Sequence, residues 1–361
     1  MQLSQLTTLM LLICLYSIRG HSKIELYLFR MLPPAPSIVF PVSDRDSLEN
    51  QVERYLERIQ NTPDLMILNP NFEVLRQQLD AQNAVPFHEN PNSSRLQVIL
   101  HANEFSDLSP ENARVRRHVN LFTNPNVENI FILPVAADLH LTEGDRADYR
   151  RQIGHNFRLR VGMGGDDVHP RLYNENITHS MRVSYTRDAS EVALIRSYQT
   201  QPGLYFGICR GHQIGAIARG DRMYQDLSKD GVADTNFHSQ HGDYLSHAEK
   251  WHSVNLVHPL LIELFGRTQI ETNSYHHQAV RLAPGSRSLV GGYATEDRIV
   301  EALVSEDGKS IGLQFHTEIP ATDPQKQNYN DLRIQFTQRL VTYTQYILHH
   351  TPPYRSCRLV L

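Results

Sequence analysis

Gly207-Ile208-Cys209-Arg210-Gly211-His212-Gln213 is the stretch from which both the fold and the chemistry of this chain can be inferred. An apolar run over 203–206 precedes it and an apolar helical pattern over 214–218 follows it, so the sequence predicts a strand, a sharp turn and a helix. Glycines two residues before and two after Cys209 permit a strained turn that presents the cysteine at the end of the strand. A structural cysteine buried in a glycine-containing turn is the alternative, and other segments must decide between the two.

Short apolar strands alternate with helical patterns on both sides of this stretch. The further strands are predicted at 96–100, 130–135, 157–163, 288–293, 299–304 and 311–315, and the helices at 111–122, 146–153, 188–198 and 332–347. Such alternation favours an α/β fold with a mostly parallel central sheet and helices on both faces. Gly164-Gly165 follows one predicted strand, at the carboxyl end where such sheets bind ligands, although a tight turn would also use a glycine pair.

The two ends of the chain differ from this pattern. Residues 6–18 form an apolar run of signal-peptide length, which is too short to span a bilayer comfortably. We therefore expect a signal peptide over 1–20 and export to the periplasm or the medium; an uncleaved anchor or a buried N-terminal helix in a cytoplasmic protein is the alternative. Residues 21–94 are expected to form a partly helical extension, with helices over 48–59, capped by Ser43, and over 72–79, and 351–361 is expected to form a tail.

The charge and composition of the chain limit the kinds of partner that it is expected to bind. The chain has 361 residues and a formal net charge of −4, so it has no basic footprint for nucleic acid or for an anionic membrane surface. We expect neither partner, apart from the membrane contact of the signal segment, and a homodimer is left open. The polar stretch 229–252 contains His238, His241, His247 and His252, but their spacing fits no standard zinc pattern. A solvated loop is the expected structure, with no metal and no cofactor.

A cysteine nucleophile needs a base and a group that orients the base. His316 and Glu318 follow the predicted strand 311–315, and in an extended strand two side chains at this spacing point to the same side. A thiolate beside a protonated histidine is stabilised, so Cys209 and His316 would make a suitable pair. A His-x-Glu pair taken alone is weak evidence, since a surface pair has the same pattern.

Several further segments occur in a fixed order around the cysteine. They are Gly164-Gly165-Asp166-Asp167-Val168-His169-Pro170, Arg187-Asp188 with Glu191, Tyr224-Gln225-Asp226, Asn273-Ser274-Tyr275-His276-His277-Gln278 and Gly312-Leu313-Gln314-Phe315-His316-Thr317-Glu318. In this order they resemble the class I glutamine amidotransferase family, and within it the γ-glutamyl-γ-aminobutyrate hydrolase-like cysteine peptidases. The resemblance covers about 157–320 and implies that 95–350 form a class I glutamine amidotransferase-like domain.

The resemblance also implies roles for individual residues. Cys209 would be the nucleophile, His316 the base and later the acid, and Glu318 the orienting carboxylate. The backbone N–H groups of Gly165 and Arg210 would form an oxyanion hole. Gly164, Gln213, His276 and His277 would lie on the substrate side. Thr317 stands where the family usually has proline between the histidine and the glutamate.

The function that the resemblance implies is hydrolysis of a γ-glutamyl amide bond through a thioester on Cys209. Two alternatives stay open at this point. One is a glutaminase that supplies ammonia to a synthase, and the other is a catalytically inactive binding protein with the same fold. Nothing in the sequence identifies the amine that a γ-glutamyl substrate would release.

Overall fold

A computed structural model describes residues 23–31, 35–90, 93–109, 111–233, 238 and 250–350. The expected signal peptide at 1–20 and the tail at 351–361 lie outside the described residues. Within the described residues, no helix is both long and apolar enough to cross a membrane.

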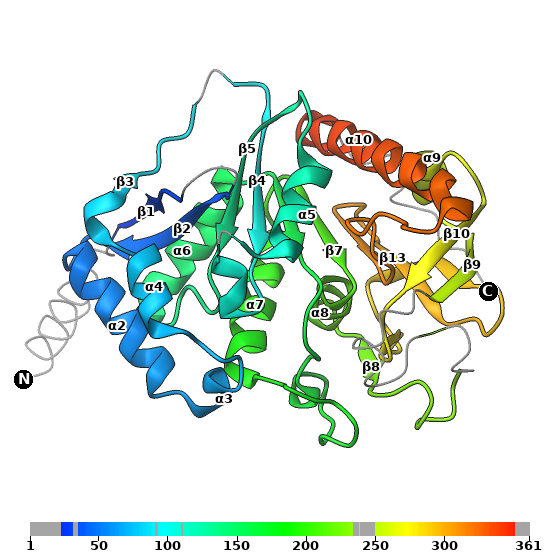
Figure 1. Cartoon of the computed structure of the whole chain (residues 1–361), viewed down its shortest axis with the longest axis horizontal. Helices are drawn as coiled ribbons and strands as arrows, with labels where there is room; N and C mark the ends of the chain where they lie inside the picture. Colours follow the sequence, from blue (N-terminus) through cyan, green and yellow to red (C-terminus); the bar gives the residue numbers. More distant parts are fainter. Residues whose placement is uncertain are drawn as a thin grey trace, which may run out of the picture.

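One large sheet runs through the whole molecule (Figure 1). Its described strands lie in the order β10-β9-β12-β13-β14-β7-β6-β4-β5-β2-β1-β3. Their bounds are β1 Ile24–Phe29, β2 Ser37–Ser43, β3 Ala84–Pro86, β4 Leu96–His101, β5 Val127–Leu133, β6 Leu159–Gly162, β7 Leu204–Ile208, β9 Lys250–Leu256, β10 Gln269–Ser274, β12 Ser288–Ala294, β13 Val300–Ser305 and β14 Ser310–Leu313. The central run from β14 to β2 is parallel, and both flanks are antiparallel. A second sheet pairs β8 (Arg222–Tyr224) with β11 (Ala279–Arg281).

Helices cover both faces of the large sheet, as the alternating pattern predicted. One face carries α2 (Leu48–Gln60), α4 (Phe72–Gln78), α5 (Ala113–Phe122), α9 (Pro259–Phe265) and α10 (Gln327–His349), whose apolar residues form one core cluster with the strands. The other face carries α6 (Glu143–Asn156), α7 (Tyr185–Tyr198) and α8 (Arg210–Ala218), which form a second cluster. The fold is therefore α/β, with a mixed and largely parallel central sheet.

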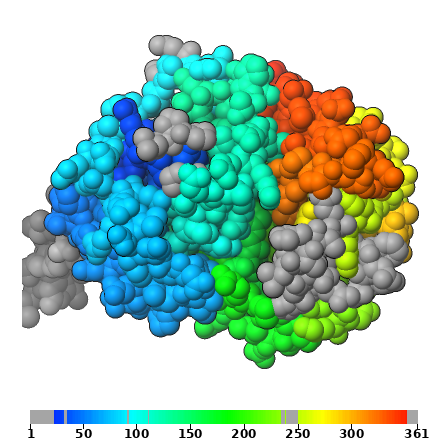
Figure 2. Space-filling view, viewed as in Figure 1, coloured from blue at the N-terminus to red at the C-terminus, as the bar shows by residue number. Residues whose placement is uncertain are grey.

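The N-terminal residues belong to this sheet and do not form a separate layer. Strand β2 pairs with β5 in parallel, and β1 then pairs with β2. The short helix α3 (Pro63–Met66) is joined to α7 through Asp64, which accepts hydrogen bonds from the backbone N–H of Thr186 at 2.7 Å and from the Ser184 hydroxyl at 3.2 Å. Figure 2 shows the N-terminal residues, in blue, packed directly against the teal centre of the molecule.

Two local expectations were wrong. Ser43 does not cap α2, because it ends strand β2; the N-cap is Ser47, whose hydroxyl accepts a hydrogen bond from the backbone N–H of Asn50 at 3.2 Å. The histidines predicted to lie in a solvated loop include two that are buried: His238 is 2% exposed and His252, which lies in β9, is 3% exposed. His241 and His247 lie outside the described residues.

Candidate active site

Cys209 occupies the sharp turn between β7 and α8 that the sequence predicted. Its backbone has φ 51° and ψ −108°, a conformation that non-glycine residues rarely adopt. The flanking glycines are required for close packing: a Cβ on Gly207 would lie 2.4 Å from the Gly211 carbonyl oxygen, and one on Gly211 would lie 2.1 Å from the Gly162 carbonyl oxygen. The turn therefore holds a strained cysteine at the N-terminus of a helix.

His316 and Glu318 lie in the turn after β14, the strand that is parallel to β7. The His316 Nδ1 atom is 2.6 Å from Glu318 Oε1, so the pair expected from the sequence is formed. The sequence analysis expected an extended strand to bring the two side chains to one side, and that was wrong. His316 and Glu318 lie beyond the strand, and the turn itself brings their side chains together. A Cβ on Gly164 would lie 2.9 Å from His316 Cε1 and 3.7 Å from Cys209 Cβ, which places all three residues around one point.

The electrostatics of this pair favour a charged imidazole. Burial lowers the pKa of His316, but Glu318 and then Cys209 raise it by more, to about 10. Burial raises the pKa of Glu318, but His316 lowers it by more, to about 2. At neutral pH the site therefore contains an ionised carboxylate beside an imidazolium that faces the cysteine.

The backbone of His316 is fixed from two sides. Asn273, at the end of β10, accepts a hydrogen bond from the His316 N–H at 2.9 Å and donates its amide to the His316 carbonyl at 3.0 Å. The Tyr329 hydroxyl of α10 donates to the same carbonyl at 2.8 Å, and the Tyr275 ring packs edge-on to the imidazole. These contacts hold the imidazole in place, so its position does not depend on the turn alone.

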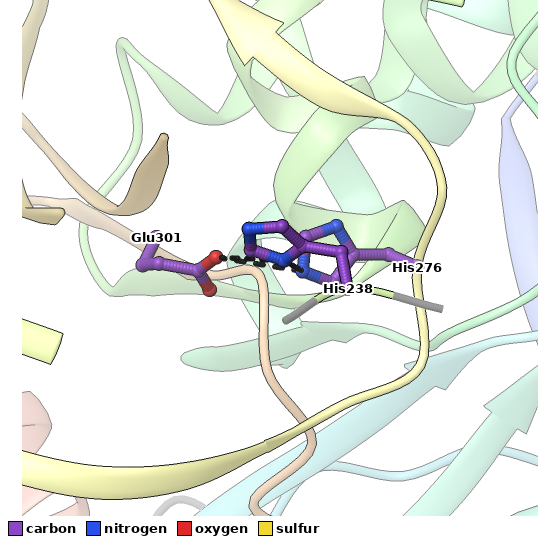
Figure 3. A group of neighbouring side chains, drawn as sticks. All are labelled: His238, His276 and Glu301. Carbon is purple, nitrogen blue, oxygen red and sulfur yellow. Dashed lines mark hydrogen bonds and ion pairs between the residues drawn. The ribbon is translucent and has the colours of Figure 1, made fainter. Parts of the chain in front are cut away.

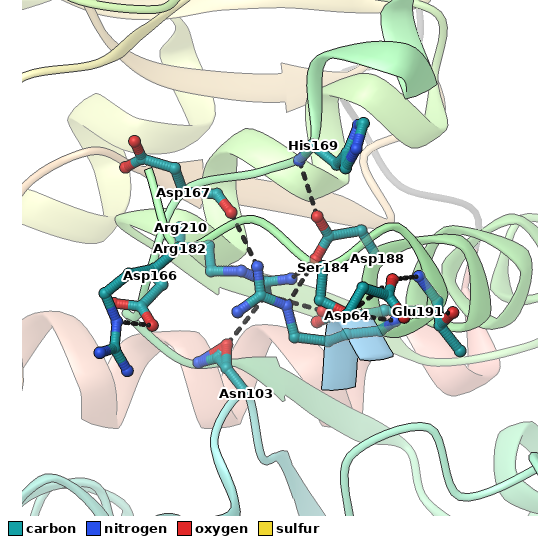
Figure 4. Close-up of polar contacts among 12 residues, drawn as sticks. Asp64, Asn103, Asp166, Asp167, His169, Arg182, Ser184, Asp188, Glu191 and Arg210 are labelled. Carbon is teal, nitrogen blue, oxygen red and sulfur yellow. Dashed lines mark hydrogen bonds and ion pairs between the residues drawn. The ribbon is translucent and has the colours of Figure 1, made fainter. Parts of the chain in front are cut away.

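Asn103 joins the two parts of the expected oxyanion hole. This residue follows β4, and its amide donates to the carbonyls of Met163 at 3.1 Å and Gly164 at 2.6 Å. Its Oδ1 accepts a hydrogen bond from Arg210 Nη1 at 2.9 Å (Figure 4). One side chain thus fixes the Gly164-Gly165 turn relative to the start of α8.

Arg210 is 1% exposed, and two carboxylates of α7 balance its charge. Its guanidinium donates to Glu191 Oε2 at 2.7 Å and to Asp188 Oδ1 at 2.6 Å (Figure 4). Burial raises the pKa of Glu191, but Arg210 and then His101 lower it to about 2. Asp188 also accepts a hydrogen bond from the His169 backbone N–H at 2.7 Å, so α7 anchors both the turn at Cys209 and the segment after Gly164-Gly165.

The residues expected on the substrate side have different surroundings. His277 Nε2 lies 3.0 Å from Asp167 Oδ1, next to the Gly164-Gly165 turn. Gln213 donates to Gln314 Oε1 at 3.2 Å and to the Gln278 carbonyl at 3.3 Å, so its amide lies within a buried network. His276 faces the carboxylate of Glu301, with Nε2 at 3.4 Å from Oε1.

Three residues at this site had no assigned role at the sequence level: Asn103, Asn273 and Gln314. Gln314 Nε2 lies 3.7 Å from Cys209 Sγ and is the polar contact that the structure gives the thiol besides His316. Asn273 and Gln314 lie within the motifs quoted above, three positions before His276 and two positions before His316 respectively. Their place as polar residues at the ends of predicted strands was a signal that could have identified them. Asn103 lies upstream of the resemblance, so no motif identified it.

The part of the chain that contains this site is similar to known proteins. Residues 142–318 match the Peptidase C26 family, and this range contains Cys209, His316, Glu318 and the Gly164-Gly165 turn. The Schizosaccharomyces pombe protein named "Putative glutamine amidotransferase PB2B2.05" is 32% identical over 172 residues, which are 47% of this chain and 65% of that protein. Protein NtpR of Enterococcus hirae is 34% identical over 161 residues, 43% of this chain and 64% of that protein.

The chain thus spans less than two thirds of the length of these two relatives. Among solved structures, a glutamine amidotransferase from Thermotoga maritima aligns with 68% of this chain and 98% of its own, at 17% identity and a TM-score of 0.45.

Proposed function

Because this chain belongs to the Peptidase C26 family and is class I glutamine amidotransferase-like, we propose that it hydrolyses γ-glutamyl amide bonds. The observation that carries the proposal is the set formed by Cys209, His316 and Glu318 at the carboxyl ends of two neighbouring parallel strands. Nucleophile, base and orienting carboxylate are the three groups that acyl transfer through a thioester requires.

In the first half of the proposed reaction, Cys209 reacts as a thiolate whose proton is held by the His316 imidazolium, and Sγ attacks the γ-carbonyl carbon. The carbonyl oxygen becomes an oxyanion, for which the N–H groups of Arg210 and Gly165 are the proposed donors. The N–H of Arg210 suits this role, since the first N–H groups of a helix have no partner within the helix. His316 then returns the proton to the amine, the C–N bond breaks and a γ-glutamyl thioester remains.

In the second half, His316 accepts a proton from water and the resulting hydroxide attacks the thioester. Collapse of the second tetrahedral intermediate breaks the C–S bond and restores the Cys209 thiolate beside the His316 imidazolium. The γ-carboxylic acid that is released gives its own proton to solvent. Glu318 keeps Nδ1 of His316 engaged at 2.6 Å, so the other ring nitrogen handles the proton in both halves.

The decisive experiment compares wild type and Cys209→Ala on γ-glutamyl amines, γ-glutamyl peptides and polyglutamates. We expect amine release by wild type and a loss of roughly 10⁴-fold or more in the variant, as for other nucleophile deletions. Intact mass spectrometry of acid-quenched wild type should show a γ-glutamyl adduct that Cys209→Ala lacks. Equal rates in the two proteins would refute the proposal, and failure of wild type to form an adduct with any of these substrates would favour an inactive binding protein.

The names of the relatives support one second candidate, a glutaminase. Free glutamine belongs in the same screen for that reason. Ammonia release from glutamine that exceeds amine release from every γ-glutamyl amide tested would reverse the order of the two candidates.

A further inference from the structure

A second cluster of ionisable residues lies outside the Cys209 site. Glu301 of β13 is fully buried, and three buried histidines surround its carboxylate: His252 of β9, His276 after β10, and His238. We call these four residues the Glu301 cluster. Its members all lie within residues 238–301, and the proposed hydrolysis assigns no step to any of them.

The atoms of the Glu301 cluster are spaced as co-ligands of one ion. His238 Nδ1 is 3.3 Å from His276 Nε2, and Glu301 Oε1 is 3.7 Å from the first nitrogen and 3.4 Å from the second (Figure 3). Zinc bonds to nitrogen and oxygen of about 2.0–2.2 Å place neighbouring ligands of a tetrahedron roughly 3.2–3.6 Å apart. All three separations fall in or next to this range.

The outer contacts of both rings fix which nitrogen of a neutral ring faces this point. The other nitrogen of His238, Nε2, lies 2.9 Å from Asp297 Oδ2, and the other nitrogen of His276, Nδ1, lies 2.9 Å from the Gln278 carbonyl. A carboxylate and a carbonyl can only accept, so these outer nitrogens carry the protons. In neutral rings, two lone pairs and the Glu301 carboxylate therefore face one another, which is the arrangement found around bound zinc.

A shared proton is the alternative to a metal ion, and the distances argue against it. Charge-assisted hydrogen bonds measure about 2.7–2.9 Å between nitrogen and oxygen, and this structure forms such contacts elsewhere: His316 to Glu318 at 2.6 Å and His238 to Asp297 at 2.9 Å. Among the residues that the structure describes, the His252 and His276 nitrogens face Glu301 Oε1 at 3.3 Å and 3.4 Å, and both contacts are longer than these hydrogen bonds. The Ser274 hydroxyl, 3.3 Å from His238 Nδ1, is a further polar neighbour of the cluster.

We propose that His238 Nδ1, His276 Nε2 and Glu301 Oε1 bind one divalent transition-metal ion of the zinc class. Two imidazoles and one carboxylate select such an ion over magnesium or calcium, which prefer oxygen ligands. His252 Nε2, 3.3 Å from Glu301 Oε1, holds the carboxylate in position, and Asp297 holds His238. This proposal is independent of the proposed hydrolysis, and it departs from the expectation that the histidines of 229–252 bind no metal.

A short chain of contacts connects the proposed metal site to Cys209. His276 Nδ1 and Gln213 Nε2 both donate to the Gln278 carbonyl, and Gln213 also donates to Gln314, which contacts Cys209 Sγ. A metal that fixes His276 would therefore stiffen the segment that supports Gln213 and Gln314. We assign it a structural role, with no part in bond breaking.

The test uses the full chain in a Cys209→Ala background, because Cys209 and His316 could themselves bind zinc. After treatment with a chelator, the protein should take up one Zn²⁺ per chain in equilibrium dialysis, and its Tm should rise with zinc concentration. Bound Co²⁺ should give visible absorption bands of a low-coordinate site without a thiolate charge-transfer band. Magnesium should produce none of these effects.

Variants then locate the ion. Glu301→Gln and His276→Gln should weaken zinc binding at least roughly 100-fold. Asp297→Asn leaves all three proposed ligands in place and alters the partner of His238, so it should weaken binding roughly 10- to 100-fold. His155→Gln is the control, since its side chain is 61% exposed and lies outside the cluster; it should bind zinc as tightly as the parent.

Circular dichroism of each variant without metal separates loss of binding from loss of fold, and Asp297→Asn remains informative if Glu301→Gln does not fold. Zinc uptake below one ion per chain in the Cys209→Ala parent overturns the proposal. Unchanged affinity in both Asp297→Asn and His276→Gln overturns it as well, because the ion would then be bound elsewhere.

Discussion

At the residue scale, the behaviour of the site depends on the contact between His316 and Glu318. Glu318 is 3% exposed, and it stabilises the imidazolium that faces Cys209. His118 is the other imidazole near Glu318, but burial lowers the pKa of His118, so it stays neutral near pH 7. The charge of this buried carboxylate is therefore balanced by His316.

We predict that Glu318→Gln lowers the pKa of His316, because the carboxylate that offsets its burial is lost. In the proposed reaction the alkaline limb of kcat/KM should move to lower pH, and kcat should fall by roughly 10²- to 10⁴-fold, as when the orienting carboxylate of a triad is neutralised. NMR titration of the His316 ring measures the pKa directly. Glu143→Gln, whose parent side chain is 83% exposed, is the control and should change neither quantity.

The same pair predicts how the stability difference between wild type and Glu318→Gln depends on pH. His316 has a raised pKa, so its contribution is complete below about 6.5, its unfolded value, and is lost as pH rises through about 10. Glu318 has a lowered pKa, so its contribution is complete above 4.5 and is lost as pH falls toward about 2. Urea unfolding should therefore show the largest deficit of Glu318→Gln between about pH 4.5 and 6.5. A deficit independent of pH would contradict this account.

At the element scale, the site is built where four neighbouring parallel strands end. Asn103 follows β4, Gly164 follows β6, Cys209 follows β7 and His316 follows β14. Carboxyl ends of parallel strands form the ligand-binding edge of open α/β sheets, so each loop delivers one part of the site. Asn103 is the part that links two other loops, by its hydrogen bonds to Gly164 and Arg210.

We predict that Asn103→Ala lowers kcat of the proposed hydrolysis by roughly 10- to 100-fold, because the Gly164-Gly165 turn loses its link to α8 and the oxyanion donors move apart. Asn156→Ala is a matched control: this buried asparagine donates its amide to the Gln152 carbonyl in α6, away from Cys209. Both variants should lose about 1–3 kcal/mol of unfolding free energy, so kcat is compared well below either Tm. If the two variants lose kcat equally, Asn103 has no positioning role.

Local signals predicted these elements well where the apolar pattern and the glycines agreed. The strand, turn and helix around Cys209, the strand 96–100 and the helix 188–198 are all present, with ends shifted by a few residues. Non-local pairing was not predictable from such signals. The conformation of 316–318 and the partners of Asn103 depend on loops separated by many residues. Glu301 did give a signal that was missed: a lone carboxylate in the apolar strand 299–304 needs a cationic partner.

At the scale of the whole molecule, one sheet connects three regions with different tasks. The parallel centre presents Cys209 and His316, the β9–β13 side carries the Glu301 cluster, and the N-terminal strands complete the opposite side (Figure 1). The sequence alone placed residues 21–94 in an extension, because 61–94 is rich in Asn, Gln and Pro and because nothing up to about Ser94 resembles the family. Its burial against α7 and β5 depends on contacts that a local pattern does not report.

We predict that the N-terminal residues and the far side of the sheet unfold in one cooperative transition. Leu56 of α2 is 1% exposed in the larger core cluster, so Leu56→Ala should cost about 2–5 kcal/mol. Trp251, the one tryptophan of the sequence, lies in β9 at the opposite end of the sheet and reports unfolding there by fluorescence. If the sheet is a single cooperative unit, Leu56→Ala must shift the Trp251 transition as much as the circular dichroism transition. Ile67→Ala, at a position 45% exposed, should shift both by less than about 0.5 kcal/mol. A Trp251 transition that stays at the wild-type midpoint while the circular dichroism transition splits would show that the N-terminal strands unfold as a separate unit.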